Sequence, residues 1–286
     1  MRRAAAVIAC ATVGVALAAH PASGMGKPRV AALQVGLQSK GLYGGAIDGV
    51  WGPRTARAVR RLQRHARIAV DGIPGTQTRR ALGRLGRHRL GSRVLRIGHV
   101  GWDVTQVQFL LAWHGFPSGT IDGGFGPRTR AAVRRFQRFA GLAVDGAPGA
   151  ATYRALRRPV PRSPIWLRRP LRTGYTDRFG PRGNRFHTGL DFPARHGVRV
   201  RAAGRGRVVK AGWDAGGYGN VVIIRHPRRT YSWYAHLGRV SVRRGRWVWA
   251  GTPIGSVGAT GHATGPHLHF EVRLRGAAVD PLTALR

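Results

Sequence analysis

The stretch DGVWGPRTARAVRRLQ, from Asp48 to Gln63, returns as DGGFGPRTRAAVRRFQ from Asp122 to Gln137. The two copies lie 74 positions apart (122 − 48). The same offset links Gln34 to Gln108, Gln63 to Gln137, Val70-Asp71-Gly72 to Val144-Asp145-Gly146, and Leu82 to Leu156. A match of this length at one offset without a gap indicates an internal duplication.

The residue pattern predicts three short helices in each copy. The middle helix begins after Gly52, where Pro53 suits a first helical position, and Val59, Leu62 and Ala66 fall on one stripe. In the second copy, Val133, Phe136 and Ala140 do the same. The flanking helices are expected at about Val30 to Lys40 and Gly75 to Leu82, and at Val104 to Trp113 and Gly149 to Leu156. The sequence therefore predicts that the first half forms two small all-α three-helix repeats, at residues 29–86 and 96–157.

The two quoted stretches resemble the three-helix peptidoglycan-binding domain of wall hydrolases. The resemblance spans about residues 29 to 157 and implies anchoring to peptidoglycan. Two alternatives stay open, because a shared fold does not fix a function: helical spacers that bind no ligand, and segments that inhibit by covering a catalytic cleft. The Pro-rich, basic run RRPVPRSP, from Arg157 to Pro164, predicts a stiff linker at residues 158–165.

The chain is strongly basic, with 49 Lys and Arg against 10 Asp and Glu and a formal net charge of +39. A field of this sign attracts polyanions, including nucleic acid, anionic wall polymers and lipid headgroups. The Arg excess also fits a GC-rich coding bias together with solubility. No nucleic-acid motif accompanies the charge, so specific nucleic-acid binding is not expected.

The first residues have the form of an export signal. Arg2 and Arg3 precede an apolar run from Ala4 to Ala19, and small residues follow up to Gly24. We expect a signal peptide at residues 1–24, and hence a secreted, wall-associated protein without a stable membrane span; an uncleaved N-terminal anchor stays open. Cys10, the only cysteine, lies in this segment. A mature chain would hold no thiol, so any metal must be bound by His and carboxylate side chains.

The second half changes character from Ile165 onward. Short runs containing Val, Ile and Trp alternate with Gly-rich turns, which predicts an all-β antiparallel domain at residues 166–286. The expected strands are Gly206 to Val209, Asn220 to Arg225, Tyr231 to His236, Trp247 to Trp249, and Leu268 to Leu274. The fold class is thus multidomain, with two small all-α repeats followed by an all-β domain.

Three histidine-bearing segments mark the all-β domain. They are FHTGLD (Phe186 to Asp191), SWYAHL (Ser232 to Leu237) and GPHLHFE (Gly265 to Glu271). Alternate residues of a strand share a face, so His267 and His269 are expected to project side by side. A catalytic zinc site needs such ligands from several segments, whereas a lone His-x-His pair favours a structural role. The remaining histidines, His196, His226 and His262, lie in turn-rich stretches and are expected in loops or at the surface.

In this order, the three segments resemble the LytM/lysostaphin-type peptidase family, also called the M23 or Gly-Gly endopeptidase family. Its H-x-x-x-D motif matches His187 and Asp191, and its H-x-H motif matches His267 and His269. Further agreement comes from RFGPR (Arg178 to Arg182), GYGN (Gly217 to Asn220), YAHL (Tyr234 to Leu237) and GSVG (Gly255 to Gly258). The resemblance implies zinc ligands at His187, Asp191 and His269 and a catalytic pair at His236 and His267.

The implied function is a zinc-dependent endopeptidase that hydrolyses peptide cross-links or stem peptides of peptidoglycan, targeted by the two repeats. In this hypothesis zinc lowers the pKa of a water molecule. One of His236 and His267 acts as general base on that water, and the other hydrogen-bonds the developing oxyanion or protonates the leaving amine. Glu271 shares their strand face, where it either orients a ligand or forms a salt bridge. The alternatives are a non-catalytic wall-binding regulator of other hydrolases and a secreted polyanion-binding protein.

Overall fold

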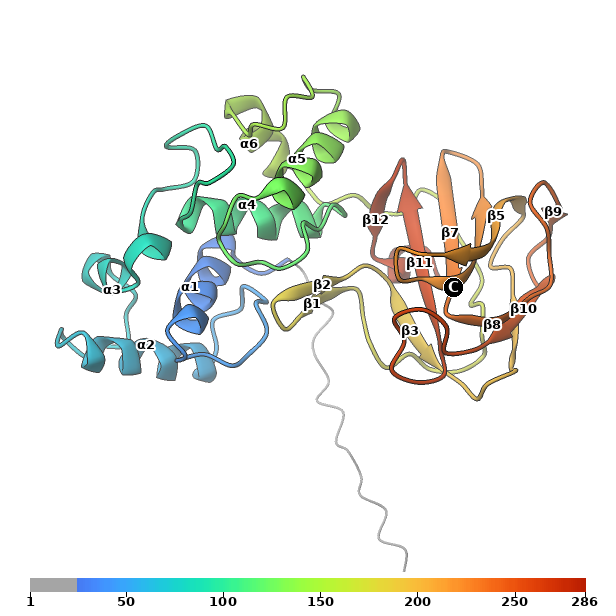
Figure 1. Ribbon diagram of the computed structural model, residues 1–286, viewed down its shortest axis with the longest axis horizontal. Helices are drawn as coiled ribbons and strands as arrows, with labels where there is room; N and C mark the ends of the chain where they lie inside the picture. Colours follow the sequence, from blue (N-terminus) through green and yellow to red (C-terminus); the bar gives the residue numbers. More distant parts are fainter. Residues whose placement is uncertain (1–24) are drawn as a thin grey trace, which may run out of the picture.

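The computed structural model describes residues 25–286. The expected signal peptide at residues 1–24 lies outside them. Six α-helices come first and antiparallel strands follow, which confirms the fold class expected from the sequence (Figure 1). Among residues 25–286, no helix has the length and apolar character that crossing a bilayer requires.

Each repeat forms three helices, as the duplicated pattern predicts. The first repeat holds α1 (Pro28–Ser39), α2 (Pro53–His65) and α3 (Thr76–Ala81), with a short 3-10 turn at Gly83–Gly86 after them. The second holds α4 (Trp102–Trp113), α5 (Pro127–Ala140) and α6 (Ala150–Leu156). A proline opens α1, α2 and α5, where its fixed φ suits the first turn and its missing N–H costs nothing. The expected helix ends agree within about two residues, the usual uncertainty of helix boundaries.

Helix α4 lies at the centre of the molecule. Every one of its residues is buried, from Trp102 to Trp113. It packs along α1 of the other repeat, and its last residue contacts Phe179 and Phe186 of the β domain. This helix therefore joins both repeats and the β domain (Figure 1).

The β domain consists of two antiparallel sheets and a hairpin. The main sheet has the order β12-β11-β7-β6-β5-β9, with β3 paired to β11, and the smaller sheet has the order β4-β10-β8. The hairpin pairs β1 (Gly180–Arg182) with β2 (Arg185–His187). The other strands are β3 (Leu190–Pro193), β4 (Arg199–Arg201), β5 (Gly206–Asp214), β6 (Gly219–Arg225), β7 (Thr230–Ala235), β8 (Leu237–Val240), β9 (Trp247–Val248), β10 (Pro253–Val257), β11 (His267–Leu274) and β12 (Ala277–Val279).

Strand β11 divides its side chains between two faces. Leu268, Phe270 and Val272 belong to the apolar core that both sheets enclose. Because side chains alternate along a strand, His267 and His269 lie on the opposite face of the sheet, as the His-x-His spacing predicts. The hydrophobic core thus packs against one face of β11, and its two histidines lie on the other face.

The β1–β2 hairpin bridges the two repeats. The Ile47 N–H donates to the carbonyl of Gly183 at the hairpin tip, and the Ile121 N–H donates to that of Asn184, each at 2.8 Å. Ile47 and Ile121 are equivalent positions of the duplication, 74 apart. One hairpin tip therefore contacts the same loop in both copies (Figure 1).

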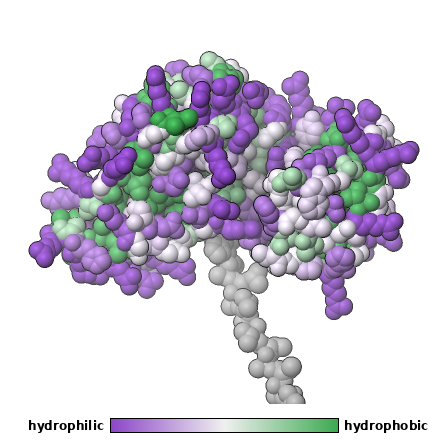
Figure 2. Space-filling view, in the orientation of Figure 1, coloured by the Kyte–Doolittle hydropathy of each residue, from purple (hydrophilic) through white to green (hydrophobic). Residues whose placement is uncertain are grey.

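Hydrophilic side chains cover most of the face seen in Figure 2, as expected for a chain of formal charge +39. Several large aromatic side chains are exceptions to this polar surface. The tryptophans that remain exposed are Trp51, Trp166, Trp213, Trp247 and Trp249.

Candidate metal centre

Three strands bring His187, Asp191 and His269 together. His187 ends β2, Asp191 is the second residue of β3, and His269 is the third of β11. Strands β3 and β11 pair with Asp191 directly opposite His269, so the register sets these two side chains beside each other. All three residues are buried, and no other group of three His, Cys, Asp or Glu side chains within residues 25–286 converges in this way.

The three side chains point their donor atoms at one another. His187 Nε2 lies 3.1 Å from Asp191 Oδ1 and 3.0 Å from His269 Nδ1. His269 Nδ1 lies 2.8 Å from the same Asp191 oxygen. Two imidazole nitrogens and one carboxylate oxygen therefore share one point of convergence.

The remaining ring nitrogens fix which atoms are free to bind a cation. The Arg178 carbonyl accepts a hydrogen bond from His187 Nδ1 at 2.9 Å, and Glu271 Oε1 accepts one from His269 Nε2 at 3.0 Å. In neutral imidazoles, this leaves lone pairs on His187 Nε2 and His269 Nδ1. Two lone pairs and a carboxylate oxygen at these distances repel one another unless a positive charge lies between them. The residues therefore fit a divalent metal ion held by two His and one Asp.

The pKa values of the cluster show how strongly it favours positive charge. Burial raises the pKa of Asp191, but when the facing nitrogens of His187 and His269 carry protons, their hydrogen bonds outweigh burial and hold that pKa well below its usual range. Burial lowers the pKa of His269, but the carboxylates of Asp191 and Glu271 outweigh it and raise the pKa to about 9. The electrostatics therefore favour a cation at the shared point.

His236 and His267 lie beside the three convergent residues. Their ring centroids are 4.8 Å apart, and His267 Nε2 lies 3.8 Å from Asp191 Oδ1. His236 Nδ1 donates to the Thr260 carbonyl and His267 Nδ1 to the Gly265 carbonyl, each at 2.8 Å. Both neutral rings consequently keep an unprotonated Nε2. The structure thus brings all five sequence-predicted site residues into one cluster.

The backbone at His236 adopts a left-handed conformation, with φ of +60°. Such a conformation is uncommon for a residue with a side chain, and it tends to occur at functional sites. The His236 N–H donates to the Tyr218 carbonyl at 2.9 Å, which holds the turn after β7. Burial and the nearby imidazoles of His269 and His267 lower the pKa of the His236 side chain, and they outweigh the hydrogen bond to the Thr260 carbonyl, so that this pKa falls to about 4.

Arg182 is a site residue to which the sequence reading gave no role. Its guanidinium contacts Asp191 Oδ2 at 2.7 Å and Asp177 Oδ2 at 2.5 Å. The bond to Oδ2 orients the Asp191 carboxylate so that Oδ1 faces the two histidines. The signal in the sequence was the RFGPR run, in which Arg182 is the last residue.

Glu271 combines the two roles between which the sequence left a choice. Its Oε1 accepts from His269 Nε2, from the Thr188 hydroxyl at 2.5 Å and from the Tyr218 hydroxyl at 2.9 Å. Its Oε2 pairs with Arg273 at 2.6 Å. This fully buried carboxylate therefore orients the His269 ring and forms a salt bridge at the same time.

A cleft of about 690 Å³ opens over the five residues, and His262 and Tyr218 line it. The other two histidines of this domain lie elsewhere. His196 is exposed, as expected. His226 lies in the loop after β6, as expected, but it is not at the surface: it is 5% exposed, with Nδ1 at 2.8 Å from the Arg205 carbonyl and Nε2 at 2.7 Å from the Ser232 hydroxyl. Its turn-rich neighbourhood gave no sign that Arg205 and Ser232 would enclose it.

Two family models match the chain. The model described as "Peptidase family M23" matches residues 185–281, which contain all five clustered residues. The model described as "Putative peptidoglycan binding domain" matches residues 26–82 and 101–156, in the two helical repeats.

Curated relatives and solved structures match part of the chain. The DD-carboxypeptidase/endopeptidase Mpg of Neisseria meningitidis is 46% identical over 99 residues, which are 35% of this chain and 23% of Mpg. The peptidoglycan DD-endopeptidase ShyC of Vibrio cholerae is 37% identical over 132 residues, 46% of this chain and 30% of ShyC. The catalytic domain of lysostaphin from Staphylococcus simulans is 34% identical, with 38% of this chain matching 90% of that one at a TM-score of 0.36. The chain spans about a quarter of the length of the first curated relatives that it matches.

Proposed function

We propose that this chain, in which a peptidase family M23 domain follows two peptidoglycan-binding segments, is a zinc-dependent endopeptidase that hydrolyses peptide bonds of bacterial peptidoglycan. The observation that carries the proposal is the convergence of His187 Nε2, Asp191 Oδ1 and His269 Nδ1, each pair within 3.1 Å. Two further imidazoles beside them supply the proton transfer that peptide hydrolysis needs.

His187, Asp191 and His269 are the residues proposed to hold zinc. Three protein ligands are typical of catalytic zinc sites, which keep one position for water or substrate. Zinc bound there supplies Lewis-acid polarisation of the scissile carbonyl and a lowered pKa for water. The Arg178 carbonyl and Glu271 orient the two imidazoles, and Arg182 orients the carboxylate. These hydrogen bonds fix the orientation of the three proposed ligand side chains independently of the metal ion.

His236 and His267 are proposed as the catalytic pair. With its pKa near 4, His236 stays neutral at physiological pH, and its Nε2 can accept a proton. His267 offers Nε2 in the same way, next to the proposed ligand Asp191. One of the two takes the proton of the attacking water, and the other hydrogen-bonds the developing oxyanion or protonates the leaving amine.

Peptidoglycan is proposed as the substrate and the wall as the place of action. Support comes from the two repeats that match the peptidoglycan-binding model, and from relatives whose names state a peptidoglycan endopeptidase activity. The formal charge of +39 also favours retention among anionic wall polymers. The repeats are proposed to target the peptidase to the wall.

The test measures zinc content and release of peptide fragments from purified sacculi. The intact chain is expected to bind one zinc ion and to lose both the ion and activity on chelation. His269→Ala removes a ligand and is expected to abolish both. His236→Ala is expected to retain zinc and to lose roughly 10²–10⁴-fold in rate, the usual contribution of general acid–base catalysis.

His65→Ala serves as the control, because His65 is an exposed histidine at the end of α2, in the first repeat. This variant should match the parent in both zinc content and rate. Fragment release that continued after complete chelation would contradict the zinc mechanism. Sacculus binding without any fragment release would instead support the non-catalytic regulator.

A further inference from the structure

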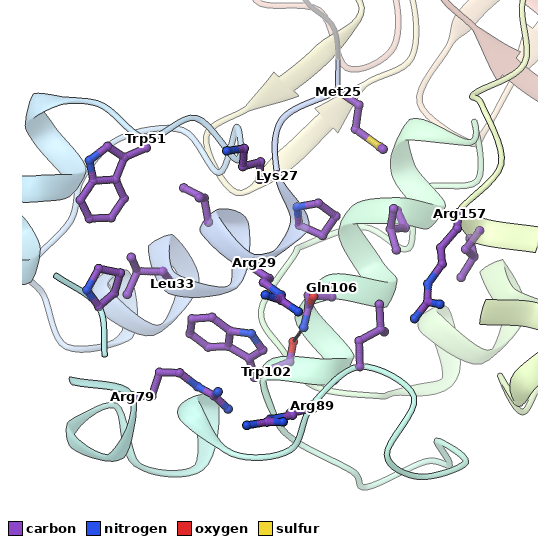
Figure 3. A pocket seen from close by; sticks show the side chains of 16 residues that line it. Met25, Lys27, Arg29, Leu33, Trp51, Arg79, Arg89, Trp102, Gln106 and Arg157 are labelled. Atoms are coloured by element: carbon purple, nitrogen blue, oxygen red, sulfur yellow. Dashed lines mark hydrogen bonds between the residues drawn. The ribbon is translucent and has the colours of Figure 1, made fainter. Parts of the chain in front are cut away.

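A second cavity lies between the two repeats, away from the metal centre. Its volume is about 990 Å³, larger than the cleft over the five clustered residues. Its apolar lining includes Leu33 of α1, Leu110 of α4 and Leu156 of α6. Figure 3 shows this cavity from close by. The cavity therefore exists only where both repeats are packed together.

Two tryptophans from different repeats line this inter-repeat cavity. Trp51 of the first repeat is 43% exposed, and Trp102 of the second lies deeper, with 6% exposed. The Arg79 guanidinium lies 5.1 Å from the Trp102 ring centroid, a cation–π contact across the two repeats. The exposed indole of Trp51 leaves a flat apolar surface free for a ligand (Figure 3).

The cavity is also strongly cationic. The basic residues that line it are Lys27, Arg29, Arg79, Arg89 and Arg157, and its lining includes no Asp or Glu. Among residues 25–286, none of the five has a carboxylate within 4.0 Å. Arg79 donates one bond, to the Gly86 carbonyl at 3.1 Å, while its buried Nε has no partner. Five cations around one concave surface without acidic partners favour an anionic ligand.

The duplication shows that this surface is specialised. At the equivalent positions of the second repeat, 74 residues on, Asp103 replaces Arg29, Phe125 replaces Trp51 and Tyr153 replaces Arg79. All three of these replacements are buried. Asp103 is paired with Arg93 at 2.8 Å, and the Tyr153 hydroxyl donates to the Arg93 carbonyl. The exposed, cationic and aromatic set thus occurs once in the tandem, although the helices that carry it occur twice.

We propose that the inter-repeat cavity binds one sugar-peptide unit of the wall, with the sugar face stacked on Trp51 and peptide carboxylates paired with Arg29 and Arg89. This inference rests on peptidoglycan being the substrate, and it places the recognition between the repeats rather than within either one. The mixed lining favours this ligand over a phosphate polymer, which would use the arginines but gain nothing from indole and leucine surfaces. Arginine is suited to the task, because its planar guanidinium pairs with carboxylate through two parallel bonds.

The experiment titrates the full chain, freed of metal by a chelator, with a soluble disaccharide-tetrapeptide prepared from bacterial wall. Trp51→Ala and the double variant Arg29→Glu/Arg89→Glu are each expected to weaken binding by about tenfold or more. The matched controls are Trp249→Ala and Arg225→Glu, exposed residues of the β domain, which should change binding less than about twofold. Trp51 is half-exposed, so its removal is not expected to unfold the repeat.

Two further probes separate the possible ligands. A disaccharide-tetrapeptide with amidated carboxylates should bind about tenfold more weakly than the acid form. A wall phosphate polymer should compete weakly, and its binding should not depend on Trp51. Equal binding of acid and amidated forms, or Trp51→Ala binding like the parent, would overturn the inference. A phosphate polymer that bound more tightly than the sugar-peptide would also overturn it.

Hydrolysis assays distinguish this inference from the proposed function. Zinc-loaded Trp51→Ala should cleave a short soluble stem peptide at the parent rate, while releasing fragments from sacculi more slowly. If the parent chain binds the sugar-peptide but cleaves neither substrate, the proposed activity fails and the binding site stands. If Trp51→Ala loses nothing on sacculi and nothing in the titration, the site fails and the activity stands.

Discussion

The imidazole of His226 shows how burial changes the pKa of a single residue. The sequence places it in a turn after β6, yet the chain buries it between a carbonyl and a hydroxyl. Burial lowers its pKa, and the hydrogen bond to the Arg205 carbonyl opposes this only in part. The folded protein therefore holds His226 neutral at a pH where an unfolded chain would begin to protonate it.

This shift makes the stability of the β domain depend on pH. The folded pKa of His226 lies below its unfolded value near 6.5, so its contribution is fully present above about pH 6.5 and is lost as pH falls toward the folded pKa. His226→Gln cannot titrate. It should unfold more easily by about 1 kcal/mol at pH 7, because one hydrogen bond is lost, but lose less stability than the parent between about pH 7 and pH 5. Urea unfolding of the parent and of His226→Gln at several pH values, in the presence of chelator, measures the free energy of unfolding. If this free energy changed with pH in the same way for both proteins, His226 would not contribute to the pH dependence.

The sequence predicts some residues of the site and misses others. His187, Asp191, His236, His267 and His269 were identified because their side-chain types and spacings are specific. Among the groups that orient them, the sequence suggested Glu271, but it did not suggest the backbone carbonyls of Arg178, Thr260 and Gly265. Every residue has a carbonyl, so its role appears only once the chain is folded.

At the scale of elements, each repeat uses the same clamp twice. A buried glutamine on a helix binds an Asp-Gly loop: its amide donates to the Asp Oδ1, and its carbonyl accepts from the Gly N–H. The glutamines are Gln34, Gln63, Gln108 and Gln137, and their loops are Asp48-Gly49, Asp71-Gly72, Asp122-Gly123 and Asp145-Gly146. A threonine on the following helix, such as Thr152, also receives a bond from each amide. The clamp thus ties two helices to the loop between them.

Removing one clamp should destabilise its repeat. Gln137→Met leaves the Gly146 N–H and the Thr152 hydroxyl in a buried place without their partner. An unsatisfied buried polar group costs about 1–3 kcal/mol, so a loss of about 2–3 kcal/mol in the free energy of unfolding is expected. The exposed Gln77, on α3, is the control, and Gln77→Met should change stability by less than about 0.5 kcal/mol. Equal effects of the two substitutions would contradict the clamp.

Elements differ in how well the sequence predicts them. The glutamines and the Asp-Gly loops were recognised as repeated positions, and the longer strands β5, β6, β7 and β11 were expected from their apolar runs. The short strands β1, β2, β4 and β12 were not expected. Each has three residues, so its existence depends on a partner strand rather than on a local pattern.

At the scale of the whole molecule, the two halves share their hydrophobic cores. Phe179, Phe186 and Ala278 of the β domain pack in the same cluster as Trp113 and α1 of the repeats. The Trp113 ring lies 5.3 Å from that of Phe186, which directly precedes His187. The repeats therefore support the β1–β2 hairpin that carries a proposed zinc ligand. Residues 158–165 join the halves in sequence, but these contacts join them in space.

The backbones of the two halves also meet at Gly115, whose carbonyl accepts a hydrogen bond from the Ala278 N–H at 3.2 Å, and this contact allows a test of their coupling. A Cβ on Gly115 would lie 2.2 Å from the Ala278 carbonyl oxygen, closer than atoms can approach. Since the halves share a core, the parent should unfold in one calorimetric transition. Gly115→Ala should separate the halves and produce two transitions, with the repeats and the β domain melting apart.

Gly141 provides the matched control, because both glycines have a positive φ, of 85° at Gly115 and 70° at Gly141. An alanine at either position bears a similar backbone strain, of about 1 kcal/mol. A Cβ on Gly141 would meet nothing within 4 Å, so only Gly115→Ala disturbs the contact between the halves. Gly141→Ala should therefore lower the midpoint and keep one transition. Two transitions in the parent itself would mean that the halves fold independently and that the hairpin does not need the repeats. The same profile for both variants would mean that the contact at Gly115 does not couple the halves.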